Sequence, residues 1–322
     1  MKTILATLLC LALLTGAQAQ RVAFWNVENL FDTQADSTIN DAEYTPGGSK
    51  HWTPKRYQAK LDQLYKTIAA MDFPLVMGLA EVENDKVLRD LCQHTPLFSM
   101  QYQYCHFDSP DPRGIDCALI YRKDHFTLLE QSPIRVSDST KHLYTRDILK
   151  VIGVTRTHDT LALFVVHLPS KRNGAIAERN RIHIAAQLRR TMDSISEKHP
   201  MFSVIVLGDF NATPQEKTFS HGLGLPCEQY VDLLADRHHQ GTYYYRGAWQ
   251  TLDHIILSTR SSQTLTADSA SIFSDEYVTS TLPHRMEKKP HRTYAGDRYL
   301  GGASDHLPVY VDLRRKNDLV NP

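Results

Sequence analysis

Two carboxylates, an amide and an imidazole lie beside apolar segments of this chain. Asp209 and Asn211 follow the apolar run 204–207, and Asp305 and His306 lie near the other end of the sequence. Residues two apart in an extended chain point to the same side, so Asp209 and Asn211 can reach toward one point. Carboxylate and amide oxygens suit a hard cation such as Mg²⁺, and an imidazole can move a proton near neutral pH. A simple turn is the alternative, because Gly, Asp and Asn are common turn formers.

Polar side chains follow three further apolar runs in the same way. These are Asn26 and Glu28 after 22–25, Glu81 after 75–80, and His167 after 161–166. If neighbouring strands end at one edge of a sheet, these groups gather at one rim. Turn chemistry alone explains so many coincidences poorly.

The elements that would position these groups are mostly short strands. Strands are expected at 22–25, 75–79, 118–121, 161–166, 204–207, 252–257 and 309–313. Helices are expected from Thr53-Pro54 to Ile68, over 85–92 and over 175–192, where apolar residues recur at helical spacing. Several successive strands have no helix between them, which favours mixed or antiparallel sheets. Two sheets packed face to face, with helices outside, would bury every amphipathic element.

The first nineteen residues read as a secretion signal. Lys2 supplies the positive start, 4–14 the apolar stretch and Ala17-Gln18-Ala19 the small-residue cleavage site. The apolar stretch is too short to span a bilayer. We expect cleavage after Ala19 and export to a periplasm or beyond. Residues 20–322 carry neither a linker nor a repeat, and with 42% hydrophobic content they are expected to form one domain.

Charge and cysteine content narrow the function classes. Of 36 basic residues the signal segment contains only Lys2, so removal leaves 35 against 36 acidic residues, a formal charge of −1. A near-neutral chain is a poor candidate for coating nucleic acid nonspecifically. Five cysteines less Cys10 leave four, none in a CxxC pair, which argues against a zinc cage. In an oxidising compartment they could form disulfides in any of three pairings.

Six short motifs give the chain a specific resemblance. In chain order they are 25–29 (Trp-Asn-Val-Glu-Asn), 80–84 (Ala-Glu-Val-Glu-Asn), 167–170 (His-Leu-Pro-Ser), 208–211 (Gly-Asp-Phe-Asn), 252–254 (Leu-Asp-His) and 304–306 (Ser-Asp-His). With these motifs the chain resembles the endonuclease/exonuclease/phosphatase superfamily, the deoxyribonuclease I-like proteins. The resemblance implies a four-layered α/β/β/α sandwich, in which two packed mixed sheets carry outer helices.

The resemblance also implies a metal site. Glu81 would be the principal metal carboxylate, with Asn26 and Asp305 as further ligands. Glu28 would either contact the metal or hold the turn. Oxygen ligands of this kind suit Mg²⁺, with Mn²⁺ or Ca²⁺ as alternatives.

Five further residues take catalytic roles by the same resemblance. Asp209 and Asn211 would hold the attacking water, the phosphate or a second ion. His306 would activate water or neutralise the phosphate, and Asp253 would orient His306. His167 would be the second catalytic histidine of the deoxyribonuclease-like branch.

Three cations are candidates for binding the substrate phosphate. They are Arg113, Arg146 and Lys171. An ordinary ion pair is the alternative for each. The aromatic run 243–249 could stack bases, but alternating strand packing explains it equally well.

We therefore predict a secreted, divalent-metal-dependent phosphoesterase that hydrolyses phosphodiesters by in-line attack of water, most simply a nuclease acting as a monomer. A phosphatase or sphingomyelinase acting on inositol phosphates, sugar phosphates or lipid headgroups is the alternative enzyme. A non-catalytic secreted binding protein is the alternative from another class. Because no strongly apolar hairpin is present, stable membrane insertion is not expected.

Overall fold

The computed structural model describes residues 20–136, 138, 143–236, 241–259, 265–267, 269–281 and 288–315. The predicted signal segment 1–19 lies outside the described residues, and its cleavage therefore stays a prediction.

A seven-stranded mixed sheet forms one half of the described structure. Its path runs β13-β19-β1-β2-β4-β3, with β14 also paired to β19. The strands are β1 (Gln20–Leu30), β2 (Val76–Val82), β3 (Tyr102–His106), β4 (Asp116–Arg122), β13 (Leu265–Ala267), β14 (Ser271–Ile272) and β19 (Val309–Arg315). Only the β1–β2 pair is parallel among those described in this sheet.

A six-stranded mixed sheet forms the other half, in the order β5-β6-β7-β8-β12-β9. The strands are β5 (Phe126–Ile134), β6 (Ile148–Thr155), β7 (Thr160–His167), β8 (Ser203–Asp209), β9 (Tyr230–Asp232) and β12 (Asp253–Ser258). Its β7–β8 pair is parallel, and the remaining described pairs are antiparallel.

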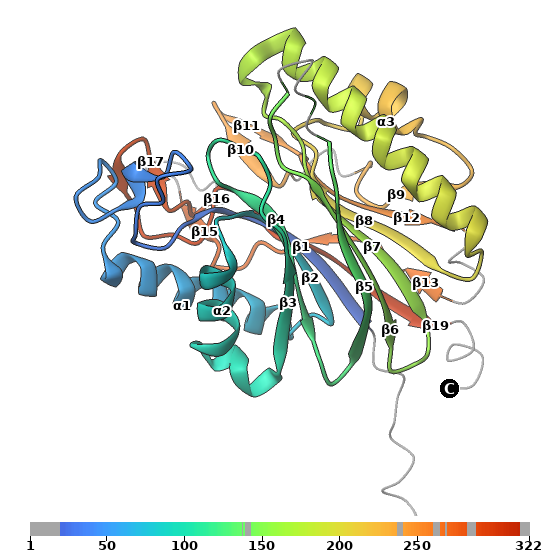
Figure 1. Ribbon diagram of the computed structural model, residues 1–322, viewed down its shortest axis with the longest axis horizontal. Helices are drawn as coiled ribbons and strands as arrows, with labels where there is room; N and C mark the ends of the chain where they lie inside the picture. The colour runs from blue at the N-terminus through green and yellow to red at the C-terminus, as the bar shows by residue number, and fades with distance from the viewer. Residues whose placement is uncertain are drawn as a thin grey trace, which may run out of the picture.

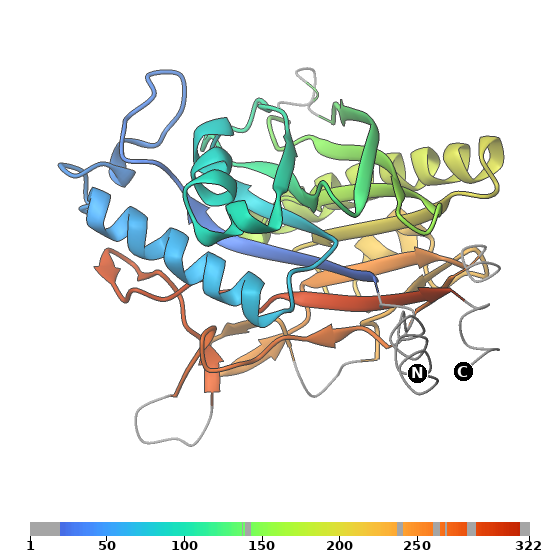
Figure 2. The same ribbon diagram turned by 90° about the horizontal axis from the view of Figure 1, so that it is seen from below.

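Helices cover the outer faces of the two sheets, as Figures 1 and 2 show. The buried side chains of α1 (Pro54–Ala70) and α2 (Asp85–Gln93) join the core around the seven-stranded sheet. Those of α3 (Gly174–Lys198) pack in a second core on the outer face of the six-stranded sheet. The layers are therefore α/β/β/α, which confirms the predicted fold.

Further short elements lie among the described residues. Three two-stranded hairpins pair β10 (Tyr243–Tyr245) with β11 (Ala248–Gln250), β15 (Thr279–Thr281) with β16 (Lys288–Pro290), and β17 (Tyr294–Ala295) with β18 (Arg298–Tyr299). Single helical turns lie at η1 (Ala42–Tyr44), η2 (Pro96–Met100), η4 (Lys171–Asn173) and η5 (Thr218–Leu223).

All three predicted helices are present within a few residues of their expected bounds. In α1 the Thr53 hydroxyl accepts a hydrogen bond from the backbone N–H of Arg56 at 3.4 Å, and Pro54 occupies the first turn. This is a favourable helix start, because the capping hydroxyl accepts a hydrogen bond from an N–H group that has no partner within the helix. The predicted apolar stripe, which includes Leu61, Leu64 and Ile68, is buried.

The two parallel strand pairs determine where the polar strand ends meet. Parallel strands need a long crossover connection, and α1 and α3 provide one in each sheet. Because the strands of a parallel pair end at the same edge, β1 and β2 finish together, and so do β7 and β8. The two sheets also contact each other through β1 and β8. Both polar edges therefore lie against one another.

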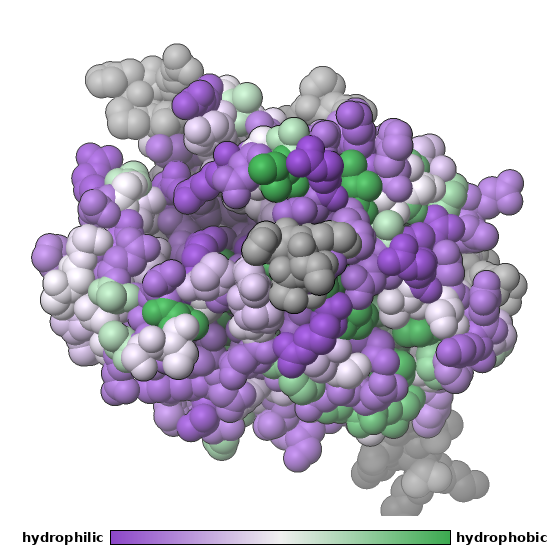
Figure 3. All heavy atoms as spheres, turned by 45° about the horizontal axis from the view of Figure 1, so that its top comes forward, coloured by the Kyte–Doolittle hydropathy of each residue, from purple (hydrophilic) through white to green (hydrophobic). Residues whose placement is uncertain are grey.

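In the described part of the chain, all four cysteines (Cys92, Cys105, Cys117 and Cys227) are free thiols, so none of the three possible disulfide pairings is present. No helix among the described residues has the length and apolar character needed to cross a bilayer. Figure 3 shows a largely hydrophilic, hollowed face on which apolar residues lie in small separate groups.

Candidate active site

Asp209, at the end of β8, is the centre of a buried polar cluster that joins the two sheets. Its Oδ2 accepts a hydrogen bond from Nδ2 of Asn26, on β1, at 3.0 Å. Nε2 of His167, at the end of β7, lies 3.6 Å from the same oxygen. His167 Nε2 also lies 3.9 Å from Oε1 of Glu81, on β2. The four central strand ends thus bring together residues that are up to 183 positions apart in sequence.

His306 reaches Asp209 from a third direction. Its Nε2 lies 3.8 Å from Asp209 Oδ2, and its Nδ1 hydrogen-bonds Asp253 Oδ2 at 2.8 Å. Asp253 can do this because β12 runs antiparallel to β8 and places it directly opposite Asp209. The ring of Tyr243 packs 4.8 Å from the imidazole, so one member of the aromatic run contacts the cluster.

The two histidines have opposite electrostatic environments. Burial lowers the pKa of His306, but Asp253 and Asp209 outweigh this effect and hold the pKa well above its usual value. Burial, together with Arg146, Arg113 and His306, holds the pKa of His167 well below its usual value. These opposite pKa shifts favour the protonated form of His306 and the neutral form of His167, as is expected where one group donates and another accepts a proton.

Asp209 is itself perturbed, since burial raises its pKa to about 7 even though the positive charge of His306 lowers it. Its second oxygen, Oδ1, accepts the backbone N–H of Asn211 at 2.8 Å. The Asn211 side chain donates through Nδ2 to the carbonyl of Leu168 at 3.0 Å. Its amide nitrogen is therefore held at the loop that follows β7.

We predict that Asp253→Asn lowers kcat by about 10- to 100-fold with little change in KM, because the His306 ring loses the charged partner that fixes its orientation. Initial-rate kinetics on a small phosphodiester would measure this. The melting temperature of the variant serves as the control, since β12 keeps its backbone pairing. A change confined to KM would contradict an orienting role for Asp253.

A second acidic group lies beside this cluster. Both oxygens of Glu28 accept backbone N–H groups, from Thr293 at 2.6 Å and from Tyr294 at 3.2 Å. Arg292 Nη2 hydrogen-bonds Asp305 Oδ2 at 2.8 Å, and Arg292 Nε lies 3.8 Å from Glu28 Oε1. Glu28 thus holds the loop around residue 293, a contact that the sequence did not predict.

Lys60 is a buried cation that the sequence analysis missed. Its Nζ donates to the carbonyl of Glu28 at 3.1 Å, to the hydroxyl of Thr293 at 2.6 Å and to the carbonyl of Ala303 at 2.5 Å. Burial lowers its pKa to about 8 against the attraction of Glu28. One signal was available, because Lys60 lies three residues after Tyr57 and four before Leu64, on the side of α1 that carries the apolar stripe.

Lys60→Met should destabilise the fold by about 2–4 kcal/mol, because three buried acceptors lose their donor while the side-chain volume is kept. Urea unfolding would measure the change. Lys55→Met, at an exposed position of the same helix, is the matched control and should leave the midpoint nearly unchanged. Equal midpoints for both variants would refute the role given to Lys60.

Three polar residues at the strand ends have left-handed backbone conformations. The φ angles are 49° at Glu28, 65° at Glu81 and 47° at Asn211. Side chains other than glycine rarely adopt this region, and such residues concentrate at functional sites. At Glu81 the conformation accompanies a register shift in the β2–β4 pairing, between Ala80 and Val82.

The three predicted phosphate-binding cations have different surroundings. Arg146 is buried and donates to Asp111 at 2.9 Å and to the carbonyl of Leu168 at 3.0 Å. Lys171 forms an ion pair with Glu216 at 2.6 Å. Arg113 is half exposed, donates to Asn29 Oδ1 at 2.6 Å and lies 3.8 Å from Glu81 Oε2. Of the three, Arg113 has both the exposure and the position to meet a ligand at Glu81.

The Asp209 cluster could hold a metal ion, because one ligand atom each of Asp209, Asp253 and His306 lies within 4.8 Å of the others. Repulsion among the acidic groups beside it also favours a cation. Burial and the neighbouring charge of Asp305 raise the pKa of Glu28 to about 7, against the opposing effect of Lys60. Arg292 and Arg113 lie against these carboxylates and Glu81. A cation bound by oxygen ligands would relieve the same repulsion, and a carboxylate-rich donor set is what Mg²⁺ prefers.

The family model for the Endonuclease/Exonuclease/phosphatase family matches residues 21–315. The chain belongs to this family. Its members are phosphoester hydrolases, for which dependence on a divalent metal is typical.

Two proteins with related structures are similar to this chain at low sequence identity. Nocturnin of Xenopus laevis is 29% identical over 114 residues, a match that spans 35% of this chain and 27% of the Nocturnin sequence. The human Nocturnin catalytic domain with a bound sulfate anion superimposes with a TM-score of 0.61 at 21% identity, covering 92% of this chain and 95% of the other. A mannosyl-6-phosphatase of Bacteroides thetaiotaomicron gives 0.60 at 17% identity, covering 91% and 98%. At these identities the structures are similar in fold alone.

Proposed function

We propose that this family member hydrolyses phosphodiesters of nucleic acid. The single observation that carries the proposal is the convergence of Asn26, His167 and His306 on one oxygen of Asp209. The alternative of a non-catalytic binding protein accounts less well for a buried, strained cluster of this kind.

In the proposed reaction, water attacks phosphorus in line, the P–O bond to the leaving alcohol breaks, and the alcohol oxygen takes up a proton. His306, as an imidazolium held by Asp253, neutralises a phosphoryl oxygen and supplies a proton. Asp209 and Asn211 position the water, and neutral His167 accepts the proton that the water loses as it attacks. Arg113, which lies beside Glu81, binds the phosphate of the substrate.

Glu81, Asn26 and Asp305 would hold the metal, for which we propose Mg²⁺, with Mn²⁺ or Ca²⁺ as alternatives. When bound, the ion polarises the phosphoryl oxygens and lowers the charge barrier to attack. Glu28 would not bind the metal directly. It would hold the loop that carries Arg292, and Arg292 pairs with the metal ligand Asp305.

Nucleic acid is favoured as the substrate by one comparison and opposed by one property. A D. rerio TDP2 with this fold is described in complex with a single-strand DNA product, at a TM-score of 0.58 and 20% identity. Against this, a formal charge of zero offers few phosphate contacts, and the mannosyl-6-phosphatase shares the fold equally well. A sugar-phosphate monoesterase is therefore the second candidate.

A substrate panel separates the two. We expect Mg²⁺-dependent hydrolysis of bis-nitrophenyl phosphate and of plasmid DNA or RNA, with little activity on mannose 6-phosphate, inositol phosphates or sphingomyelin. Hydrolysis of monoesters alone would overturn the nuclease and leave the phosphatase. If no substrate were turned over with metal present, the binding protein would stand.

We further propose that residues 20–322 act as one exported catalytic domain and as a monomer. Amino-terminal sequencing of protein recovered outside the cytoplasm should begin at Gln20, and its mass by light scattering should match a single chain. Recovery of an intact Met1 terminus would contradict export by cleavage.

A further inference from the structure

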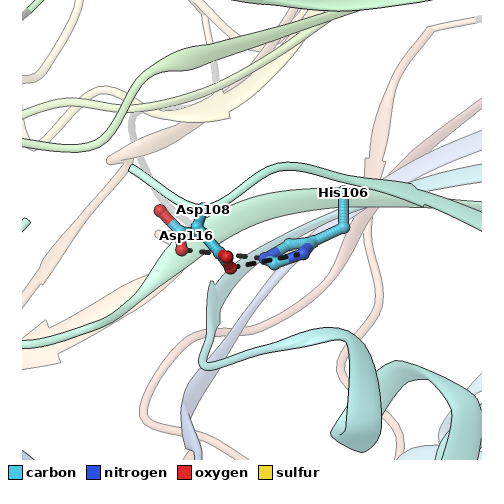
Figure 4. A group of neighbouring side chains, drawn as sticks. All are labelled: His106, Asp108 and Asp116. Carbon is cyan, nitrogen blue, oxygen red and sulfur yellow. Dashed lines mark ion pairs between the residues drawn. The ribbon is translucent and has the colours of Figure 1, made fainter. Parts of the chain in front are cut away.

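His106, Asp108 and Asp116 form a second polar cluster, separate from the side chains around Asp209. His106 ends β3, Asp116 begins β4, and Asp108 lies in the loop between these strands. One ligand atom from each of the three lies within 4.8 Å of the others. Figure 4 shows both carboxylates directed toward the imidazole ring.

The imidazole of His106 is the feature that points to a ligand. Its side chain is only 3% exposed, and within the described residues its Nε2 has no hydrogen-bond partner. Asp116 Oδ2, the nearest acidic oxygen, lies 3.7 Å away, beyond hydrogen-bonding distance. A buried polar atom without a partner is costly, and a neutral imidazole nitrogen is a common metal ligand.

The Asp116 carboxylate is fixed in a suitable orientation. Its side chain is 4% exposed, and its Oδ1 accepts a hydrogen bond from the hydroxyl of Ser109. This contact leaves Oδ2 directed at His106. Outer hydrogen bonds of this kind commonly orient metal-binding carboxylates.

We propose that His106, Asp108 and Asp116 bind a divalent transition-metal ion, for which Zn²⁺ is the best chemical match. Zn²⁺ bonds of about 2.0–2.2 Å place the ligand atoms of a tetrahedral site about 3.3–3.6 Å apart. The separation of 3.7 Å between His106 and Asp116 is close to this value. The Asp108 side chain is 88% exposed, and its Oδ1 lies 4.0 Å from the other ring nitrogen, Nδ1. Rotation of this side chain would bring its carboxylate to an ion held by His106 Nε2 and Asp116. Water completes the coordination.

The ligand set distinguishes this site from the oxygen-lined site at Glu81. One imidazole nitrogen with two carboxylates favours Zn²⁺ and similar ions, whereas Mg²⁺ and Ca²⁺ prefer oxygen ligands throughout. The two sites therefore select different metals.

The bound ion would hold the loop 107–115 in place. Asp108 lies near the start of this loop and Asp116 directly follows it, and Arg113 within it reaches Asn29 Oδ1 at 2.6 Å and lies 3.8 Å from Glu81 Oε2. An ion that joins the two ends of the loop would thus restrict the position of Arg113 at the rim of the candidate active site.

Zn²⁺ titration of the full chain carrying Glu81→Gln, with excess Mg²⁺ present, tests the proposal without reference to catalysis. We expect one Zn²⁺ per chain, a higher melting temperature with Zn²⁺ and slower hydrogen exchange of the amides in 107–115. His106→Gln and Asp116→Asn should each weaken Zn²⁺ binding by about tenfold or more. His94→Gln, at an exposed histidine that also pairs with an aspartate, is the matched control and should bind as the parent does.

Asp108→Asn covers the case in which a buried variant fails to fold, because Asp108 is exposed. It should fold normally and bind Zn²⁺ more weakly by about tenfold. No Zn²⁺ bound in the parent, or equal affinity in the parent and in Asp108→Asn and His106→Gln, would overturn the site. Either result would leave the proposed phosphodiesterase activity untouched.

Discussion

His306→Ala is expected to lower kcat on a phosphodiester by about 10²–10⁴-fold, the range that a general acid or base contributes. The variant removes the imidazole that lies between Asp253 and Asp209. Asp253 and Asp209 then lose their positively charged neighbour. We expect both carboxylates to take up protons, and the protein to stay folded. Single-turnover kinetics on bis-nitrophenyl phosphate with saturating Mg²⁺ would give the loss directly.

His94→Ala is the control for the loss of a histidine as such, because His94 is exposed and pairs with Asp90 of α2. It should retain the parental rate. Circular dichroism and melting temperature would show that the His306 variant is folded. A folded His306→Ala protein working within about threefold of the parent, a difference of under 1 kcal/mol, would remove His306 from the mechanism.

The second large effect is expected at Glu81. Glu81→Gln should reduce Mg²⁺-dependent turnover by about 10²–10³-fold, equivalent to about 3–4 kcal/mol of lost transition-state stabilisation. Glutamine keeps the side-chain shape and the left-handed backbone, and its oxygen can still accept the N–H of Asn29, so the change isolates charge. Dialysis of the parent against EDTA should abolish turnover, and added Mg²⁺ should restore it.

Glu130→Gln, on the edge strand β5 and paired with Lys150, is a control of the same chemistry outside the cluster. Its rate and its Mg²⁺ requirement should match those of the parent. Unchanged Mg²⁺ affinity in Glu81→Gln would show that the ion binds elsewhere. Full activity in EDTA would refute metal dependence altogether.

The strand ends were predictable because the sequence changes abruptly from apolar to polar residues there. The apolar run before Asp209 is a buried central strand, and the same holds for the runs before Asn26, Glu81 and His167. The apolar pattern of the sequence does not indicate which strands are parallel. The direction of neighbouring strands nevertheless decides which strand ends meet. The missed strands, β3, β5 and β6 among them, either are short or include intermediate and exposed positions that blur their apolar pattern.

Other features depend on distant partners and have no local signature. Lysines on helices are usually solvated. The burial of Lys60 depends on acceptors up to 243 residues away, so the local sequence could not predict it. The left-handed backbone at Glu81 follows from a register shift that only the paired strand reveals. Arg292, between β16 and β17, and Tyr243, in β10, reach the site only through the packing of these hairpins, which the sequence does not specify.

The two sheets contribute opposite halves of the candidate active site, so neither half can hold a ligand until both have docked. Recovery of turnover during refolding should therefore lag behind the return of the far-ultraviolet strand signal. The rate of turnover would therefore report when the two sheets have packed together.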